Sequence, residues 1–143
     1  MGRRACARPR RSAATRVSGV TYDAGALIAA ERRERRIWAR HRSLLLQQIV
    51  PTVPAPVVAQ CWRPTPRQAR LAQLLAGCDV ESFDNDMARA SGILASRAGT
   101  TDVVDACVVE GAARRDDLVI SADDADLNAI AAAGGLTIGI RRP

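Results

Sequence analysis

The sequence predicts an α/β fold, with a central parallel sheet of about five short strands and helices on both of its faces. Short apolar runs rich in β-branched residues alternate with longer segments of helical periodicity, as in parallel sheets with crossover helices. The chain has 143 residues, 48% of them hydrophobic, which is enough for one domain with a substantial core. Because it holds only two Trp, one Tyr and one Phe, that core must consist mainly of Ala, Val, Leu and Ile.

The first third of the chain predicts two strands and the helical region between them. Residues 17–23 read as the first strand, and residues 24–48 are helical with a break near Glu31. The segment IVPTVP, residues 49–54, predicts a second strand that its prolines keep short.

Two helical segments precede the third strand. Residues 55–63 carry Pro56 in the first turn, where helices tolerate proline. Residues 66–76 have helically spaced apolar side chains, and Gly77 is a typical helix stop. The segment CDVESF, residues 78–83, alternates polar and apolar side chains as a strand does.

The second half predicts three helices and two strands. Asp84 stands in the N-cap position of a helix that ends at Gly99, and residues 100–102 cap another that reaches about Arg115. The remaining predicted elements are a strand at residues 118–121, a helix ending near residue 133, a turn at residues 134–135 and a last strand at residues 136–140.

The net charge of +6 comes from the first residues of the chain. Residues 1–18 contain six arginines and no acid, whereas the rest carries fifteen arginines and fifteen acids. We therefore expect a basic, disordered tail at residues 1–18 and one domain at residues 19–143. Residues 31–42 are basic and residues 79–143 hold twelve acids against six arginines. This polarity suits an anion-attracting rim beside an acidic pocket, although a solvated helix face would explain residues 31–42 equally well.

Composition argues against several classes of protein. No apolar run is long enough to span a membrane, and residues 1–18 lack the apolar core of a secretory signal, so we expect a cytoplasmic location. The four cysteines form no C-x-x-C pair, and the single histidine leaves a zinc site or a His-dependent triad without its usual parts. The absence of lysine argues against phosphoaspartate receivers and haloacid-dehalogenase-like phosphatases.

Aspartates follow the predicted strand ends. Asp23 ends the first strand, Asp123 follows the fourth, and Asp102 and Asp105 lie three residues apart at the start of one helix. In open α/β sheets, binding sites form beyond the carboxyl ends of the strands. If the first and fourth strands are neighbours, these four carboxylates converge on one pocket.

Crowded carboxylates repel one another, so their pKa values rise unless a cation neutralises them. Oxygen ligands without a soft competitor favour Mg²⁺, or alternatively Mn²⁺, and such a metal can activate water at a phosphate. We therefore predict that Asp23, Asp102, Asp105 and Asp123 bind Mg²⁺. Helix capping alone would account for Asp102 and Asp123, but less easily for Asp105, which lies inside the apolar run VVDACVV.

Four segments, taken in their order and spacing, resemble the PIN domain and specifically a VapC-type toxin of a type II toxin–antitoxin system. They are YDAGALIA at residues 22–29, TPRQARLAQLLAG at residues 65–77, GTTDVVDACVV at residues 99–109 and VISADDADL at residues 119–127. The resemblance covers about residues 19–143 and implies a PIN-like three-layer α/β/α fold.

The resemblance also assigns roles to individual residues. It places the family's catalytic and metal-binding aspartates on Asp23, Asp105 and Asp123, with Asp102 and Asp126 as accessory acids. The family's glutamate, on the helix after the second strand, falls on Gln60. Because an amide brings no charge, this departure is expected to lower the affinity for Mg²⁺ and the strength of the general base.

Membership of the VapC type implies a Mg²⁺-dependent endoribonuclease that cleaves RNA, with tRNA or rRNA as the expected substrate, and thereby inhibits translation and growth. It also implies a homodimer that a cognate antitoxin neutralises. Because Gln60 replaces the glutamate, the alternative is a catalytically weak PIN module that binds RNA or a protein partner without efficient cleavage.

Overall fold

The computed structural model describes residues 18–143, so the predicted tail at residues 1–18 lies outside the described residues except for Ser18. The strands are β1 (Gly19–Tyr22), β2 (Thr52–Pro54), β3 (Asp79–Glu81), β4 (Asp117–Ile120) and β5 (Gly139–Arg141). The helices are α1 (Ala24–Glu31), α2 (Arg35–Leu46), α3 (Ala55–Cys61), α4 (Ala69–Ala76), α5 (Asn85–Ala98), α6 (Val103–Arg115) and α7 (Asp124–Ala133), with a 3-10 turn, η1 (Pro66–Gln68), before α4.

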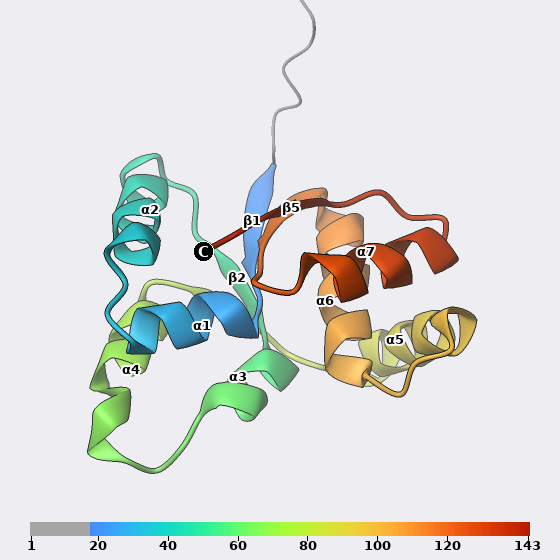
Figure 1. The fold of residues 1–143 in the computed structure, drawn as a ribbon, viewed down its shortest axis with the longest axis horizontal. Helices are drawn as coiled ribbons and strands as arrows, with labels where there is room; N and C mark the ends of the chain where they lie inside the picture. The colour runs from blue at the N-terminus through green and yellow to red at the C-terminus, as the bar shows by residue number, and fades with distance from the viewer. Residues whose placement is uncertain (1–17) are drawn as a thin grey trace, which may run out of the picture.

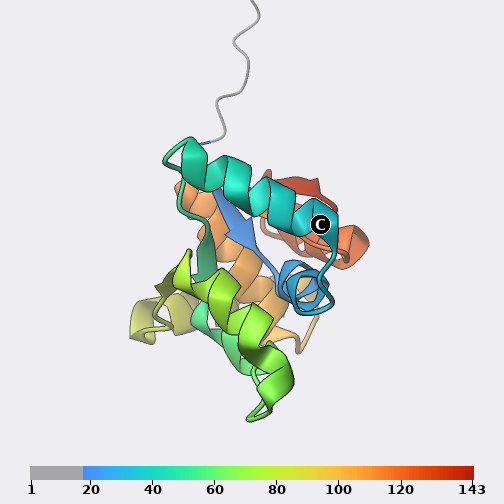
Figure 2. The ribbon, with the colours of Figure 1, turned by 90° about the vertical axis from the view of Figure 1, so that its left-hand side faces the viewer.

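The five strands form one sheet in the order β3-β2-β1-β4-β5, and all neighbouring strands are parallel. Helices α1, α2 and α4 lie on one side of the sheet, and α5, α6 and α7 lie on the other (Figure 1). Figure 2 looks onto the first of these layers, where α2 and α4 cross in front of the strands. The predicted PIN-like three-layer α/β/α arrangement with a parallel five-stranded sheet is confirmed.

The helix ends follow the capping residues that the sequence indicates. The Asp84 carboxylate accepts a hydrogen bond of 2.9 Å from the backbone N–H of Met87 at the start of α5. Helix α5 ends at Gly99, whose φ of 66° lies in the left-handed region that favours glycine. The Asp102 carboxylate caps α6 in the same way, so the local sequence fixes where both helices begin.

The last strand begins later than predicted, at Gly139 rather than at residue 136. The backbone N–H of Leu136 donates to the carbonyl of Ala131 over 2.8 Å, so Leu136 closes the end of α7 and is not part of a strand. Among residues 18–143, strand β5 pairs with β4 alone, and its ladder starts where Gly139 meets Leu118.

The C-terminal end of α6 is fastened to the sheet by Arg115. Its guanidinium donates to the carboxylate of Asp117 over 2.8 Å and to the hydroxyl of Thr21 over 2.9 Å, and it also pairs with Glu81. Thr21 and Asp117 are buried and bond to each other over 2.7 Å. These contacts join α6 to β1, β3 and β4 at the end opposite to its predicted site residue, Asp105.

We expect the substitution Arg115→Met to lower the free energy of unfolding by about 3 kcal/mol, because it leaves the buried Asp117 carboxylate without its cation. Urea denaturation followed by circular dichroism measures this loss. The matched control is Arg97→Met at an exposed position of α5, where the change should stay below about 0.5 kcal/mol. Equal losses in the two variants would contradict the role of Arg115.

Among residues 18–143, no helix combines the length and the apolar character needed to cross a membrane. The cysteines in this part of the chain, Cys61, Cys78 and Cys107, are free thiols.

Candidate metal centre at the carboxyl end of the sheet

The pairing of β1 with β4 creates the candidate site. Tyr22 lies opposite Ile120, and the backbone N–H of Asp23 donates to the Ile120 carbonyl over 3.0 Å. The first and fourth strands are therefore neighbours, which is the condition for the aspartates at their ends to converge. The sheet continues from β1 to β2 on one side of this pair and from β4 to β5 on the other, so the strand order switches direction between β1 and β4. Open α/β sheets bind ligands at such switch points.

Asp23 is buried at this switch point, with 4% of its surface exposed. Its Oδ2 accepts a hydrogen bond of 2.7 Å from the hydroxyl of Ser121, and that hydroxyl accepts a bond of 3.0 Å from the N–H of Asp123. Its Oδ1 is buried and has no hydrogen-bond partner among the described residues. Burying a carboxylate oxygen without a hydrogen-bond donor costs free energy, so this atom indicates that a ligand binds to it.

Ser121 is a site residue that the sequence analysis missed. The sequence predicts Ser121 only as the end of a strand, whereas in the structure its hydroxyl connects Asp23 to the loop that carries Asp123. The available signal was a hydroxyl residue directly after a buried strand and two residues before an acid.

Three other carboxylates form a group near Asp23, and the oxygens of Asp23 itself lie outside that group. Asp105, Asp123 and Asp126 each offer an oxygen atom, and these atoms all lie within 4.8 Å of one another. Asp105 comes from the first turn of α6, and Asp123 and Asp126 come from the start of α7. Two predicted ligands thus lie together, and Asp126, predicted only as an accessory acid, joins them.

Asp102 has a structural role at this place. One of its carboxylate oxygens accepts the backbone N–H of Asp105 over 3.0 Å and thereby caps α6. Asp102 also borders, with Asp105 and Asp126, a cavity of about 300 Å³. It therefore positions Asp105 and adds negative charge to the rim of the centre.

The pKa shifts show that these carboxylates share one electrostatic environment. Burial, followed by the charges of Asp102, Asp23, Asp123 and Asp126, raises the pKa of Asp105 to about 7. Burial also raises the pKa of Asp23, whereas the Ser121 hydroxyl and the backbone N–H of Ala24 lower it, and the charges of Asp123 and Asp102 add to the effect of burial. A cation bound among them would remove this repulsion.

The donor set fits a hard divalent cation. It consists of carboxylate oxygens alone, which suit Mg²⁺ and Mn²⁺. The buried, unpartnered Oδ1 of Asp23 is an observation independent of the exposed acidic cluster, and it indicates a ligand at Asp23. The start of α1 lies close to the loop before α7, because a Cβ on Gly25 would stand 2.6 Å from the backbone nitrogen of Ala122. Glycine at this position therefore allows Asp23 to sit beside Asp123.

Gln60, which the PIN resemblance sets at the position of a glutamate, lies apart from the cavity beside Asp105. It is exposed on α3 and lines a hollow between α1 and α3 together with Glu31 and Arg63. The cavity beside Asp105 and Asp126 is a different one.

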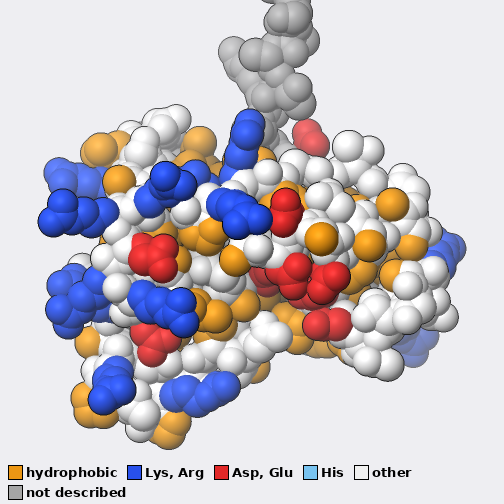
Figure 3. All heavy atoms as spheres, in the orientation of Figure 1, with side chains coloured by type: hydrophobic (Ala, Val, Ile, Leu, Met, Phe, Trp, Pro, Cys, Tyr) orange, Lys and Arg blue, Asp and Glu red, His pale blue; other side chains and the backbone are white. Residues whose placement is uncertain are grey.

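Arginines surround the acidic centre on one side. Figure 3 shows acidic side chains in the middle of the face and basic side chains over the side where α1, α2 and α4 lie. Three hollows lie around the C-terminal part of α1, and Ile28 lines all three. The exposed arginines that also line these hollows are Arg32, Arg33, Arg36, Arg63, Arg67 and Arg142. The predicted arrangement of a basic rim beside an acidic pocket is present in the structure.

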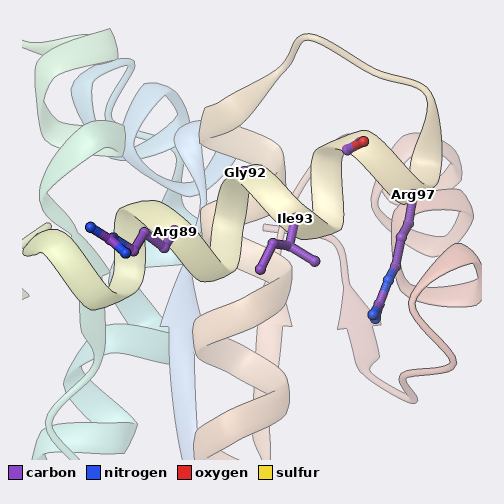
Figure 4. Close-up of a pocket in the computed structure, with 5 residues that line it drawn as sticks. Arg89, Gly92, Ile93 and Arg97 are labelled. Atoms are coloured by element: carbon purple, nitrogen blue, oxygen red, sulfur yellow. The ribbon is translucent and has the colours of Figure 1, made fainter.

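A hollow of about 680 Å³ lies apart from both features on α5. Arg89, Gly92, Ile93 and Arg97 line it along one face of the helix (Figure 4). It holds no acid and no buried polar side chain, so it offers no chemistry comparable to that of the acidic centre.

We expect Ser121→Ala to weaken binding of Mn²⁺ by about tenfold, because the variant no longer orients the Asp23 carboxylate. Isothermal titration calorimetry with Mn²⁺ measures the affinity. Ser96→Ala on the exposed face of α5 is the matched control and should bind like the unaltered protein. Unchanged affinity in Ser121→Ala would contradict a positioning role.

Comparison with known proteins agrees with the fold. No protein-family model matches the sequence, and no curated protein matches it. Among solved structures, a chain in the structure of FitAB bound to an IR36 DNA fragment is similar, with a TM-score of 0.58 and 19% sequence identity. The match covers 87% of this chain and 94% of that one, so the shared architecture extends over nearly the whole of both.

Proposed function

We propose that this chain is a VapC-type PIN-domain toxin, a metal-dependent endoribonuclease of the cytoplasm that a cognate antitoxin neutralises. The observation that carries the proposal is the buried, unpartnered oxygen of Asp23 beside three carboxylates whose oxygens lie within 4.8 Å of one another. These acids occupy the switch point of a parallel sheet, in the positions that the PIN resemblance indicates.

Asp23, Asp105, Asp123 and Asp126 are the residues that would hold Mg²⁺ or Mn²⁺. When bound, such an ion supplies an activated water molecule and neutralises charge that builds on a phosphodiester. The chain's own groups prepare the site: the hydroxyl of Ser121 holds Asp23, and the negative charges that help to raise the pKa values of Asp23 and Asp105 favour uptake of a cation.

Nucleic acid is the substrate class that the charge pattern supports. The arginine rim stands next to the acidic centre, so a phosphate backbone held by arginines would pass over the carboxylates. The similar FitAB structure contains a DNA fragment, which supports a nucleic-acid partner in general terms. We propose RNA as the cleaved strand, with tRNA or rRNA as the natural substrate.

The second candidate function is a PIN module that binds RNA or a protein partner but cleaves poorly. The exposed amide of Gln60 favours it, because α3 supplies no carboxylate at the position where the family has its glutamate. A weaker site for Mg²⁺ would follow from that substitution.

Cleavage of a mixed pool of tRNA and rRNA decides between the two. The purified protein is incubated with Mg²⁺, with Mn²⁺ or with EDTA, and a DNA pool of similar length is run in parallel. Metal-dependent loss of intact RNA that Asp23→Asn abolishes would support the nuclease. Intact RNA under every condition, from folded protein free of antitoxin, would support the binding module.

The homodimer and the antitoxin are tested separately. Sedimentation equilibrium should give twice the mass of the 15.3 kDa chain. A small protein encoded beside this chain should co-purify with it and suppress its cleavage of RNA. A monomer would contradict the proposed dimer without affecting the nuclease.

A further inference from the structure

The hollow between α1 and α3 begins at the residue that follows Asp23 in the chain. It has a volume of about 430 Å³, and Ala24, the residue after Asp23, forms part of its wall. Burial raises the pKa of the Cys61 thiol, which also lines the hollow, and the charge of Asp23 adds to that effect. Both observations place the hollow near Asp23.

The lining of this hollow combines apolar walls with hydrogen-bonding groups of both kinds. Ala24 and Ile28 supply apolar surface from α1. The exposed amide of Gln60 can donate and accept, the carboxylate of Glu31 accepts, and the guanidinium of Arg63 donates. This is the complement of a nucleobase, which has apolar faces and an edge with donors and acceptors.

A buried glutamine fixes the two walls against each other. Gln68 has 4% of its surface exposed, and its side-chain amide donates to the carbonyl of Cys61 over 2.8 Å and to the carboxylate of Glu31 over 3.5 Å. Its carbonyl oxygen accepts from the backbone N–H of Arg63. The hollow is thus held in shape before anything binds, as a site that discriminates between ligands requires.

We propose that this hollow binds one unpaired base of the RNA strand, next to the phosphate held at the acidic centre, and that Gln60 and Arg63 determine which base is accepted. The proposal rests on the function proposed above and adds the part that selects the cleavage site. Gln60 would then recognise a base and would not bind the metal. Its amide can both donate hydrogen bonds to a base edge and accept them, whereas a carboxylate can only accept them.

Single-stranded RNA is the occupant that the surroundings favour. A hollow of this size accommodates one base, and a base can enter it only when it is unstacked and unpaired. The adjoining hollow, which shares Ile28 and Glu31 with this one, is lined by Arg32, Arg33 and Arg67 and provides cations for the neighbouring phosphates.

The test measures binding without cleavage. Four fluorescently labelled RNA hexamers of uridine, each with A, C, G or U at the third position, are titrated with protein in EDTA and followed by anisotropy. The unaltered protein should bind the best hexamer about fivefold or more tightly than the worst, as expected for one base read by hydrogen bonds. Gln60→Ala and Arg63→Ala should each reduce that ratio to below about twofold, whereas Arg97→Ala on α5 should leave it unchanged.

Three results would overturn the proposal. The first is equal binding of all four hexamers by the unaltered protein, and the second is a ratio that survives in both variants. The third is that the variants keep their base preference but lose binding of the antitoxin, which would make the hollow a protein-binding site. Metal-dependent cleavage of the mixed RNA pool judges the nuclease separately, so a protein that cleaves without discriminating bases contradicts only the base pocket.

Discussion

Asp23→Asn and Asp105→Asn are each expected to lower the rate of RNA cleavage by at least about 100-fold. Each substitution keeps the shape of the side chain but removes one negative charge from the acidic centre. Asp23 supplies the buried oxygen that has no other partner, and Asp105 supplies one of the three oxygens grouped within 4.8 Å. The rate is measured with a labelled RNA fragment in Mg²⁺ under single-turnover conditions.

Asp116→Asn is the control for this experiment. Asp116 is exposed and ends α6 with a φ of 58°, a conformation that asparagine also adopts readily. The variant should therefore keep its fold and its full cleavage rate. If Asp105→Asn cleaved at the rate of the Asp116→Asn control, the acidic centre would not be the catalytic site, and the binding module would become the better description.

The position of the aspartates could be predicted from the sequence because strand ends and helix starts are local features. Asp23 follows a short apolar strand, Asp105 lies in the first turn of a helix, and the alternation of strands and helices makes a parallel sheet the expected topology. The adjacency of β1 and β4 then places Asp23 beside the loop that carries Asp123, as the structure shows.

The orientation of individual side chains could not be predicted in the same way. The contact between Ser121 and Asp23 joins residues 98 positions apart, and it depends on how the loop after β4 turns. Asp126 stands three residues after Asp123, a spacing that allows a shared helix face, but capping of α7 explained it equally well. Gln60 aligns with a metal-binding position in sequence, whereas its amide lines the hollow that α1 and α3 form by packing.

Metal-free protein is expected to lose stability as the pH rises from about 4 to about 7, and Asp105 is the cause. Its pKa is about 7 in the folded chain against 3.8 for an unperturbed carboxyl, so the folded state binds the proton more tightly. The stability that this proton contributes is complete below pH 4 and is lost as the pH rises through the folded value. Asp105→Asn removes the titrating group, so its stability advantage over the unaltered protein should grow between pH 4 and pH 7.

Divalent metal should reverse this loss in the unaltered protein only. A bound cation favours the ionised carboxylates and competes with the proton, so stabilisation by Mn²⁺ should be larger at pH 8 than at pH 5.5. At a concentration one hundred times the dissociation constant, binding contributes about 2.7 kcal/mol, or a rise in melting temperature of about 5–10 °C. Asp105→Asn should gain much less, because it lacks one ligand and the repulsion that the metal relieves.

Thermal unfolding at pH 5.5 and pH 8, with EDTA or with Mn²⁺, measures all of these differences without any RNA present. This readout separates metal binding from catalysis: a weak PIN module with an intact acidic centre would show the metal-dependent shift yet leave RNA uncleaved. A melting temperature that is independent of both pH and Mn²⁺ would mean that the carboxylates neither repel one another nor hold a cation. In that case the raised pKa of Asp105 and the unpartnered oxygen of Asp23 would need a different explanation, and the metal-dependent mechanism would be wrong.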